Sequence, residues 1–160
     1  MKFTHLLHIN DSLNLLIDPM TRGQLWLGLV MRARSPALFV PWLDGCQIVA
    51  KSASVFERVL RYGEVEIHDV VTLVPEQEIR YKIAAQGEVP ASRLVVKIEE
   101  PGDALLDVRF SYDDDIEEVP GSLEAFYNSY RRSAYEESDI DTIRILRQFA
   151  GEGRLNLPME

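Results

Sequence analysis

Apolar residues recur along this chain with two different spacings, which divide it into helical and extended regions. Phe3 to Asn10 mixes apolar and polar residues as a strand does, and Asp11 to Asp18 is interpreted as a loop or an extension of that strand. Helical spacing of three and four residues follows, at Leu25, Trp26, Leu29, Val30 and Ala33. From Cys46 to Tyr112 the spacing falls to two, and after Ser122 it returns to the helical value.

The first helix carries clear start signals. Thr21 and Gln24 stand three residues apart, as the hydroxyl and the amide of a capping box do. Gly28 lies in mid-helix, where it costs about 1 kcal/mol against alanine, and it either permits close approach of a neighbour or is simply tolerated. Ser35-Pro36 then predicts a second, short helix that runs through Phe39.

The central region predicts a sheet. Six apolar stretches alternate with turn residues, at Cys46–Lys51, Val55–Tyr62, Val65–Val74, Glu78–Ala85, Arg93–Glu99 and Ala104–Tyr112. Because connections this short leave no room for crossover helices, neighbouring strands are expected to run antiparallel as a meander.

The C-terminal helix is predicted to begin after Ser122 and to end at Ala150-Gly151. Its first half carries one apolar stripe, made of Leu123, Phe126, Tyr127, Tyr130 and Ala134. Its second half carries another stripe roughly 180° away, made of Ile140, Ile143, Leu146 and Ala150. One straight helix cannot turn both stripes toward one sheet, so the pattern predicts a kink or break near Tyr135–Ser138. The alternative is that the second stripe faces another subunit.

This order of elements can bury its apolar faces in one natural way. The predicted fold is α+β, with a curved seven-stranded antiparallel sheet wrapped on the long C-terminal helix as a single domain over residues 1–160. A sheet curved this strongly leaves interior space, and such interiors commonly receive an apolar ligand. A fully packed core is the alternative.

Composition and charge exclude several classes of function. With 46% apolar and 27% charged residues among 160, the chain suits one globular domain. A formal charge of −9 argues against nucleic acid or an anionic membrane as a partner. No apolar run approaches the roughly 20 residues of a membrane helix, and the start lacks a signal peptide, so a cytoplasmic protein is expected. The single cysteine, Cys46, excludes an internal disulfide.

The element order also resembles the helix-grip fold of the START-like and birch-pollen-allergen-like (SRPBCC) superfamily. The segments Gln24 to Val30, Arg32 to Pro36 and Phe39-Val40 are similar to its AtaL-like branch, a family of unknown function. Similarity continues at Arg58, Tyr62-Gly63, Val70-Val71, Glu99 to Pro101, Tyr112, Ala134-Tyr135 and Asp141 to Ile143. The resemblance covers nearly the whole chain and implies the fold and a habit of binding hydrophobic molecules. It implies no established reaction and no catalytic residues.

The hairpin at Gly63-Glu64 supplies one specific prediction. If these two residues form the turn, Arg58 falls opposite Asp69 among apolar pairs such as Leu60 with Ile67. Burying either charge alone is costly, so the two are expected to pair. The pair is either a polar anchor for a ligand carboxylate, enol or carbonyl, or a structural ion pair within the sheet. A slip of one residue would exchange the two faces.

The residues predicted to line the ligand cavity alternate with outward-facing ones on the strands, or lie on the helix stripes. They are Trp26, Arg58, Leu60, Tyr62, Ile67, Asp69, Tyr81, Ile83, Val108, Phe110, Tyr112, Tyr127 and Tyr130. The alternative for the aromatic residues is ordinary core packing, with any polar tip at the edge.

The chain offers no convincing metal or cofactor motif. His5 and His8 stand three apart on a strand and are expected on opposite faces, and His68 is expected to face outward. Zinc needs three or four converging ligands. The acidic run from Asp113 to Glu118 lacks the spacing of a calcium loop and is interpreted as a solvated loop near the cavity mouth. No phosphate-binding glycine loop is present.

Three functions remain. The first is a carrier or sensor of a small hydrophobic or aromatic molecule. The second is an enzyme of the polyketide cyclase or aromatase type, in which Arg58 would polarise an enolate while Asp69 or a tyrosine moves a proton. The third is a protein-interaction module that uses the sheet edge or the second helix stripe. A homodimer is kept open as an alternative.

Overall fold

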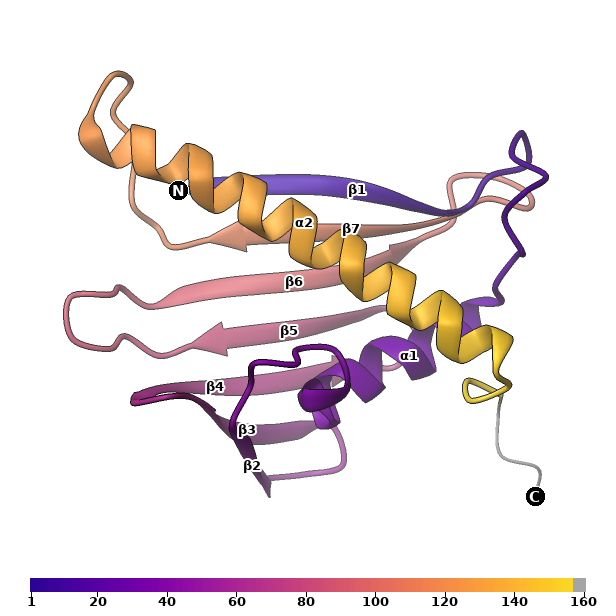
Figure 1. Cartoon of the computed structure of the whole chain (residues 1–160), viewed down its shortest axis with the longest axis horizontal. Helices are drawn as coiled ribbons and strands as arrows, with labels where there is room; N and C mark the ends of the chain where they lie inside the picture. The colour runs from indigo at the N-terminus through magenta and orange to yellow at the C-terminus, as the bar shows by residue number, and fades with distance from the viewer. Residues whose placement is uncertain (157–160) are drawn as a thin grey trace.

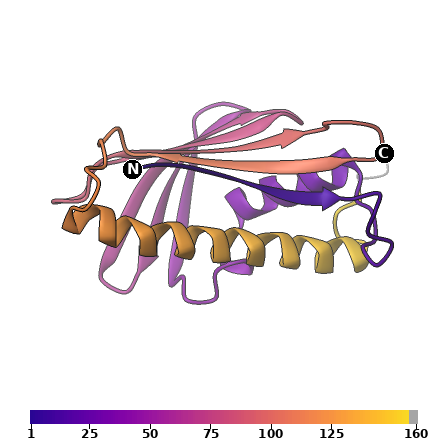
Figure 2. The same cartoon turned by 90° about the horizontal axis from the view of Figure 1, so that it is seen from above.

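The computed structural model describes residues 1–156 and shows a seven-stranded sheet with two helices on one face (Figure 1). The elements are β1 (Lys2–Asn10), α1 (Arg22–Arg34), the 3-10 helix η1 (Pro36–Leu38), β2 (Gly45–Ala50), β3 (Val55–Tyr62), β4 (Val65–Val74), β5 (Glu78–Ile83), β6 (Ser92–Glu99), β7 (Leu106–Asp113) and α2 (Leu123–Gly151). The strand order is β1-β7-β6-β5-β4-β3-β2, with every neighbouring pair antiparallel. In Figure 2 the sheet curves around the long helix, which confirms the predicted helix-grip fold.

The β3–β4 hairpin has the register that the sequence predicts. Arg58 is paired with Asp69, and Leu60 with Ile67. Gly63 supplies the turn with a φ of 60°, a left-handed conformation that glycine adopts without steric cost. The hairpin therefore places the Arg58–Asp69 pair on the face that the helices cover.

Helix α1 begins as predicted and packs closely on α2. The Thr21 side chain accepts the Gln24 backbone N–H, and the Gln24 amide oxygen accepts the Thr21 N–H, so both halves of the capping box form. A methyl group added at Gly28 would overlap the Leu146 side chain. Because Gly28 has no side chain, α1 and α2 can pack closely at this point.

The core lies between the sheet and the region where α1 meets the C-terminal half of α2 (Figure 1). Its largest fully buried apolar side chains come from β1, α1, β3, β5, β7 and α2 and from the segment after α2: Ile9, Leu25, Phe56, Ile79, Phe110, Leu146 and Leu155. Apolar burial of this extent is the main favourable contribution to folding. It fixes the sheet against the helices at one end of the molecule.

The predicted kink or break in the C-terminal helix is wrong, because α2 runs as one helix from Leu123 to Gly151. Its second stripe packs inward through Ile143 and Leu146. The physical reason is that the buried position in its first half is polar and has a polar partner: Asn128 is buried and its Nδ2 donates to Glu118. Asp139, directly after the segment expected to break, is 1% exposed and is held by β1 and β7.

The first stripe of α2 faces solvent as a consequence. Phe126 and Tyr130 are 55% and 64% exposed, and Leu123 and Tyr127 are exposed beside them. The rings of Phe126 and Tyr130 meet edge to face, with centroids 5.3 Å apart. Among the described residues, no helix is long and apolar enough to cross a membrane.

Candidate functional site

Side chains on the concave face become more exposed toward the β3–β4 turn. In the middle of the face, Ile79, Val96 and Phe110 are buried in adjacent strands. Nearer the turn the apolar residues are only half buried, and they are Tyr62, Ile67, Ile83, Leu94 and Tyr112. We call these five residues the open end of the concave face. In Figure 1, neither helix covers the β5 and β6 ends that carry Ile83 and Leu94.

The thirteen predicted cavity residues fall into three groups. Six are buried, namely Arg58, Leu60, Asp69, Tyr81, Val108 and Phe110. Five are half buried, namely Trp26, Tyr62, Ile67, Ile83 and Tyr112. Tyr127 and Tyr130 lie on the exposed stripe of α2. Whether any of them binds a ligand stays a prediction.

Arg58 and Asp69 form a closed ion pair. The Arg58 Nε donates to Asp69 Oδ1 at 2.9 Å, and Nη2 donates to Oδ2 at 2.6 Å. The third nitrogen, Nη1, donates to the Ala33 carbonyl of α1 at 2.9 Å, and the guanidinium lies over the Tyr81 ring. Bonds to the Asp69 carboxylate raise the pKa of Arg58 against the opposing effect of burial. All three guanidinium nitrogens are thus already bonded within the protein.

A second polar cluster, unforeseen from the sequence, joins α2 to the sheet. Asp139 Oδ2 accepts the Tyr112 hydroxyl at 2.6 Å and lies 2.7 Å from His5 Nε2. The Tyr112 ring stacks on Tyr135 of α2, with centroids 4.1 Å apart. Burial raises the pKa of Asp139, and bonds from Tyr112 and His5 oppose that rise. The Asp139 Oδ1 atom is buried and has no hydrogen-bond partner among the described residues.

Arg32 lies between the two polar clusters. Its Nε donates to the Thr142 hydroxyl of α2 at 3.0 Å. Burial raises the pKa of both Tyr62 and Tyr112, and the positive charge of Arg32 opposes the rise in each case. Sequence reasoning missed Arg32, although it falls within the segment that carries the family resemblance. Arg32 lies three residues after Leu29 and four after Gly28, both buried, so helical spacing was a signal that could have placed it near the inward side.

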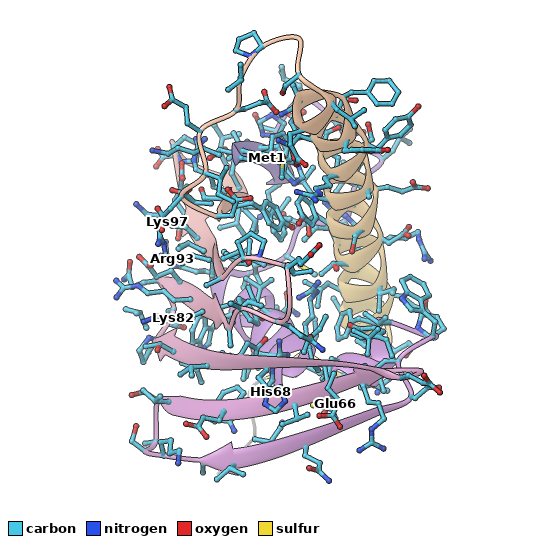
Figure 3. All side chains as sticks on the ribbon, turned by 90° about the vertical axis from the view of Figure 1, so that its left-hand side faces the viewer. Met1, Glu66, His68, Lys82, Arg93 and Lys97 are labelled. Atoms are coloured by element: carbon cyan, nitrogen blue, oxygen red, sulfur yellow. The ribbon has the colours of Figure 1, made fainter. Side chains whose placement is uncertain are left out.

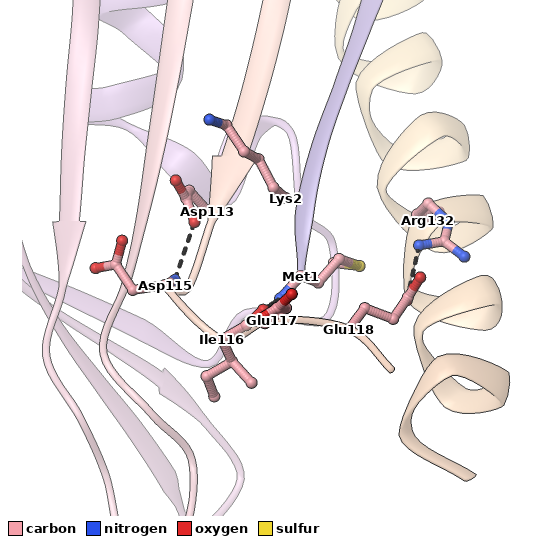
Figure 4. Close-up of a pocket in the computed structure, with 8 residues that line it drawn as sticks. All are labelled: Met1, Lys2, Asp113, Asp115, Ile116, Glu117, Glu118 and Arg132. Carbon is pink, nitrogen blue, oxygen red and sulfur yellow. Dashed lines mark hydrogen bonds and ion pairs between the residues drawn. The ribbon is translucent and has the colours of Figure 1, made fainter. Parts of the chain in front are cut away.

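Two surface pockets lie elsewhere. The larger, of about 410 Å³, lies at the start of β1 (Figure 4), where charged residues such as Asp113 and Arg132 line it. There Arg132 donates to Glu118 at 3.1 Å. The smaller, of about 160 Å³, includes His8 and Asp107. Neither pocket is lined by a residue predicted for the internal cavity.

The outer face of the sheet is charged. Figure 3 shows Lys82, Arg93 and Lys97 pointing away from α2. His8 and His68 are exposed on this side, whereas His5 is inside, as the alternation of the strands predicts. Within residues 1–156, no three His, Cys, Asp or Glu side chains gather as metal ligands would.

Sequence similarity establishes the family to which this chain belongs. Residues 7–153 match the sequence pattern of the family described as AtaL, acetylaranotin biosynthesis cluster protein L. The chain belongs to the AtaL family. A comparison of this AtaL-family chain with curated protein sequences gave no significant match.

Solved structures share the fold of this AtaL-family protein at low sequence identity. The di-domain ARO/CYC BexL from the BE-7585A biosynthetic pathway is 14% identical with a TM-score of 0.65, over 92% of this chain and 49% of BexL. This chain therefore spans about half the length of BexL. The Zhui aromatase/cyclase from Streptomyces sp. R1128 is 11% identical with a TM-score of 0.61, over 98% of this chain and 96% of Zhui. The Aha1 dimer from Colwellia psychrerythraea is 12% identical with a TM-score of 0.59, over 92% and 96%.

Proposed function

We propose that this AtaL-family protein binds a small hydrophobic molecule at the open end of its concave face. The observation that carries the proposal is the half-buried state of Ile67, Ile83 and Leu94, on the face that the helices cover elsewhere. Leaving such side chains partly in water forfeits part of the roughly 25 cal/mol per Å² that burial supplies. An apolar ligand that covers these side chains would supply this missing free energy of burial.

The polar groups around this surface suit a ligand with a few oxygen atoms. Tyr62 and Tyr112 bring two hydroxyl groups to the open end, of which that of Tyr112 donates to Asp139, and the positive charge of Arg32 acts on both tyrosines. Small-molecule sites typically combine an apolar wall with a few such groups. Aromatase/cyclases share the fold, which supports testing aromatic and polyketide-like molecules first.

The geometry favours binding over the cyclase alternative in which Arg58 and Asp69 carry the chemistry. Arg58 and Asp69 are each 5% exposed, and both carboxylate oxygens accept bonds from the guanidinium. A substrate would have to displace a buried ion pair, which is costly. The pair is therefore assigned a structural role in this proposal.

The proposal is tested by titrating the protein with the neutral fluorescent probe N-phenyl-1-naphthylamine. Ile83→Ser and Leu94→Ser are each expected to lower its affinity by roughly tenfold, the effect of losing one large apolar contact. Val89→Ser is the matched control, because Val89 is exposed in the β5–β6 loop, and should leave affinity unchanged. Equal affinity in all four proteins, or no binding to the wild type, would overturn the proposal.

A further inference from the structure

Arg58 and Arg32, which both lie on the concave side of the sheet, differ in what neutralises their charge. Arg58 has a carboxylate on two of its nitrogens and a carbonyl on the third. Arg32 makes one side-chain hydrogen bond, from Nε to Thr142, and neither Nη1 nor Nη2 has a partner among residues 1–156. Arg32 as a whole is half buried, while Nη1 and Nη2 stay accessible to an incoming group. Donors in this state gain from an incoming acceptor.

Hydrogen bonds and strand register place Arg32 near the open end of the concave face: Thr142 lies one turn after Asp139, which holds the Tyr112 hydroxyl, and Tyr112 is paired with Leu94. Thr142, which holds its Nε, is buried on the side of α2 that faces the sheet. The charge of Arg32 acts on Tyr62 of β3, on Tyr112 of β7 and on Asp139 of α2. These residues come from three different elements, and Arg32 lies within electrostatic range of all of them.

Asp139, whose pKa the charge of Arg32 lowers, does not form an ion pair with it. Asp139 uses Oδ2 for Tyr112 and His5, its Oδ1 has no partner, and no ion pair joins it to Arg32. Burial raises the pKa of Asp139, which favours its uncharged form. Arg32 is therefore a half-buried cation for which residues 1–156 supply no ion-pair partner and no acceptor for Nη1 or Nη2.

We propose, building on the proposed function, that the ligand is an amphiphilic acid whose apolar body packs on Ile83 and Leu94 while its anionic group binds Nη1 and Nη2 of Arg32. The anionic group is a carboxylate, a sulfonate or an ionised enol or phenol, all of which present acceptor oxygens to a guanidinium. A fork of N–H donors recognises such groups more strongly than neutral ones.

Two dyes with nearly the same apolar body separate this inference from the proposed function. 1-Anilinonaphthalene-8-sulfonate carries an anionic group, and N-phenyl-1-naphthylamine does not. Arg32→Gln is expected to weaken sulfonate binding tenfold or more, the usual effect of losing charge-assisted bonds. Binding of the neutral dye should stay within about twofold, because its contacts are apolar. Arg144→Gln is the control of equal charge change, since Arg144 is exposed and pairs with Asp141.

Each outcome decides between the two proposals. Loss of both dyes alike in Arg32→Gln, or of neither, would overturn the inference while binding at the open end stands. Failure of both dyes to bind the folded wild type would overturn the proposed function and this inference with it. Because Arg32→Gln also alters the bond to Thr142, the wild type supplies a second readout. Raising the salt concentration should weaken binding of the anionic dye and leave the neutral dye unchanged, and equal salt dependence would contradict the inference.

Discussion

Arg58 and Asp69 stand opposite each other on β3 and β4, with two guanidinium nitrogens 2.9 and 2.6 Å from the two carboxylate oxygens. The third nitrogen reaches the Ala33 carbonyl, so the pair also ties the sheet to α1. Removing one partner would leave the other charge buried and uncompensated. The pair therefore predicts a loss of stability when either residue is replaced alone.

Arg58→Met is expected to lower the free energy of unfolding by about 3–5 kcal/mol, the usual cost of stranding a buried charge. Replacing both residues, as Arg58→Met with Asp69→Leu, should recover much of that loss. Urea unfolding at neutral pH measures both. The control is Arg61→Met, because Arg61 and Glu66 form an exposed pair in the same hairpin, worth at most about 1 kcal/mol. An equal effect of Arg58→Met and Arg61→Met would contradict the structural role.

Gly28 gives a prediction about helix contact. Gly28→Ala puts a methyl group into the Leu146 side chain and should cost about 1–3 kcal/mol of unfolding free energy, despite the better helix propensity of alanine. Leu146→Val in the same protein should relieve part of that cost. Gly151→Ala is the control, because nothing lies within 4 Å of a methyl group there. A stabilised Gly28→Ala protein would show that α1 and α2 do not meet at this point.

Asp139 gives a prediction about pH. Since burial raises its pKa, the folded protein holds this proton more tightly than the unfolded chain, whose Asp titrates near ~3.9. The corresponding stability is present below the unfolded pKa and is lost as pH rises through the folded pKa. Wild-type stability relative to Asp139→Asn should therefore fall between about pH 4 and pH 7. Urea unfolding at both pH values measures the difference.

The control for this pH effect is Asp141→Asn, since Asp141 is exposed on the same helix. It should show a much smaller change relative to wild type over the same range. A difference between wild type and Asp139→Asn that stays constant with pH would contradict a raised pKa. Because His5 Nε2 lies 2.7 Å from Asp139 Oδ2, the comparison reports on the His5–Asp139 pair together.

The buried face of α2 and its exposed first stripe give opposite predictions. Phe149→Ala should cost about 3–5 kcal/mol, because Phe149 is buried against Phe39. Phe126→Ala should change stability by no more than about 0.5 kcal/mol, because Phe126 is on the solvent side. Thermal unfolding at several protein concentrations measures both. A large loss in Phe126→Ala that depends on concentration would instead support the homodimer that the sequence leaves open.

Much of the fold could be predicted because it depends on local patterns. The β3–β4 register follows from one two-residue turn, and the start of α1 follows from Thr21 and Gln24. The path of α2 could not be predicted from apolar spacing alone. Spacing says nothing about polar residues that find buried partners, and Asp139 is bonded to residues more than twenty positions away in sequence.

Part of the candidate site could be predicted because strand alternation is also a local pattern. Tyr62, Ile67, Ile83 and Tyr112 follow from strand alternation, and so does their place on the concave face. Leu94 was missed although it alternates with Val96 and Ile98 on β6, a signal present in the sequence. Arg32 could not be found this way, because its role depends on how α1 lies against α2.

A methyl NMR titration of the protein with N-phenyl-1-naphthylamine would locate the binding site residue by residue. If the ligand binds at the open end, the largest chemical-shift changes should fall on the methyl groups of Ile67, Ile83 and Leu94. Leu13 and Leu123, which are exposed elsewhere, should stay unchanged. Shifts confined to Leu13, Leu123 or other residues outside the concave face would contradict binding at its open end.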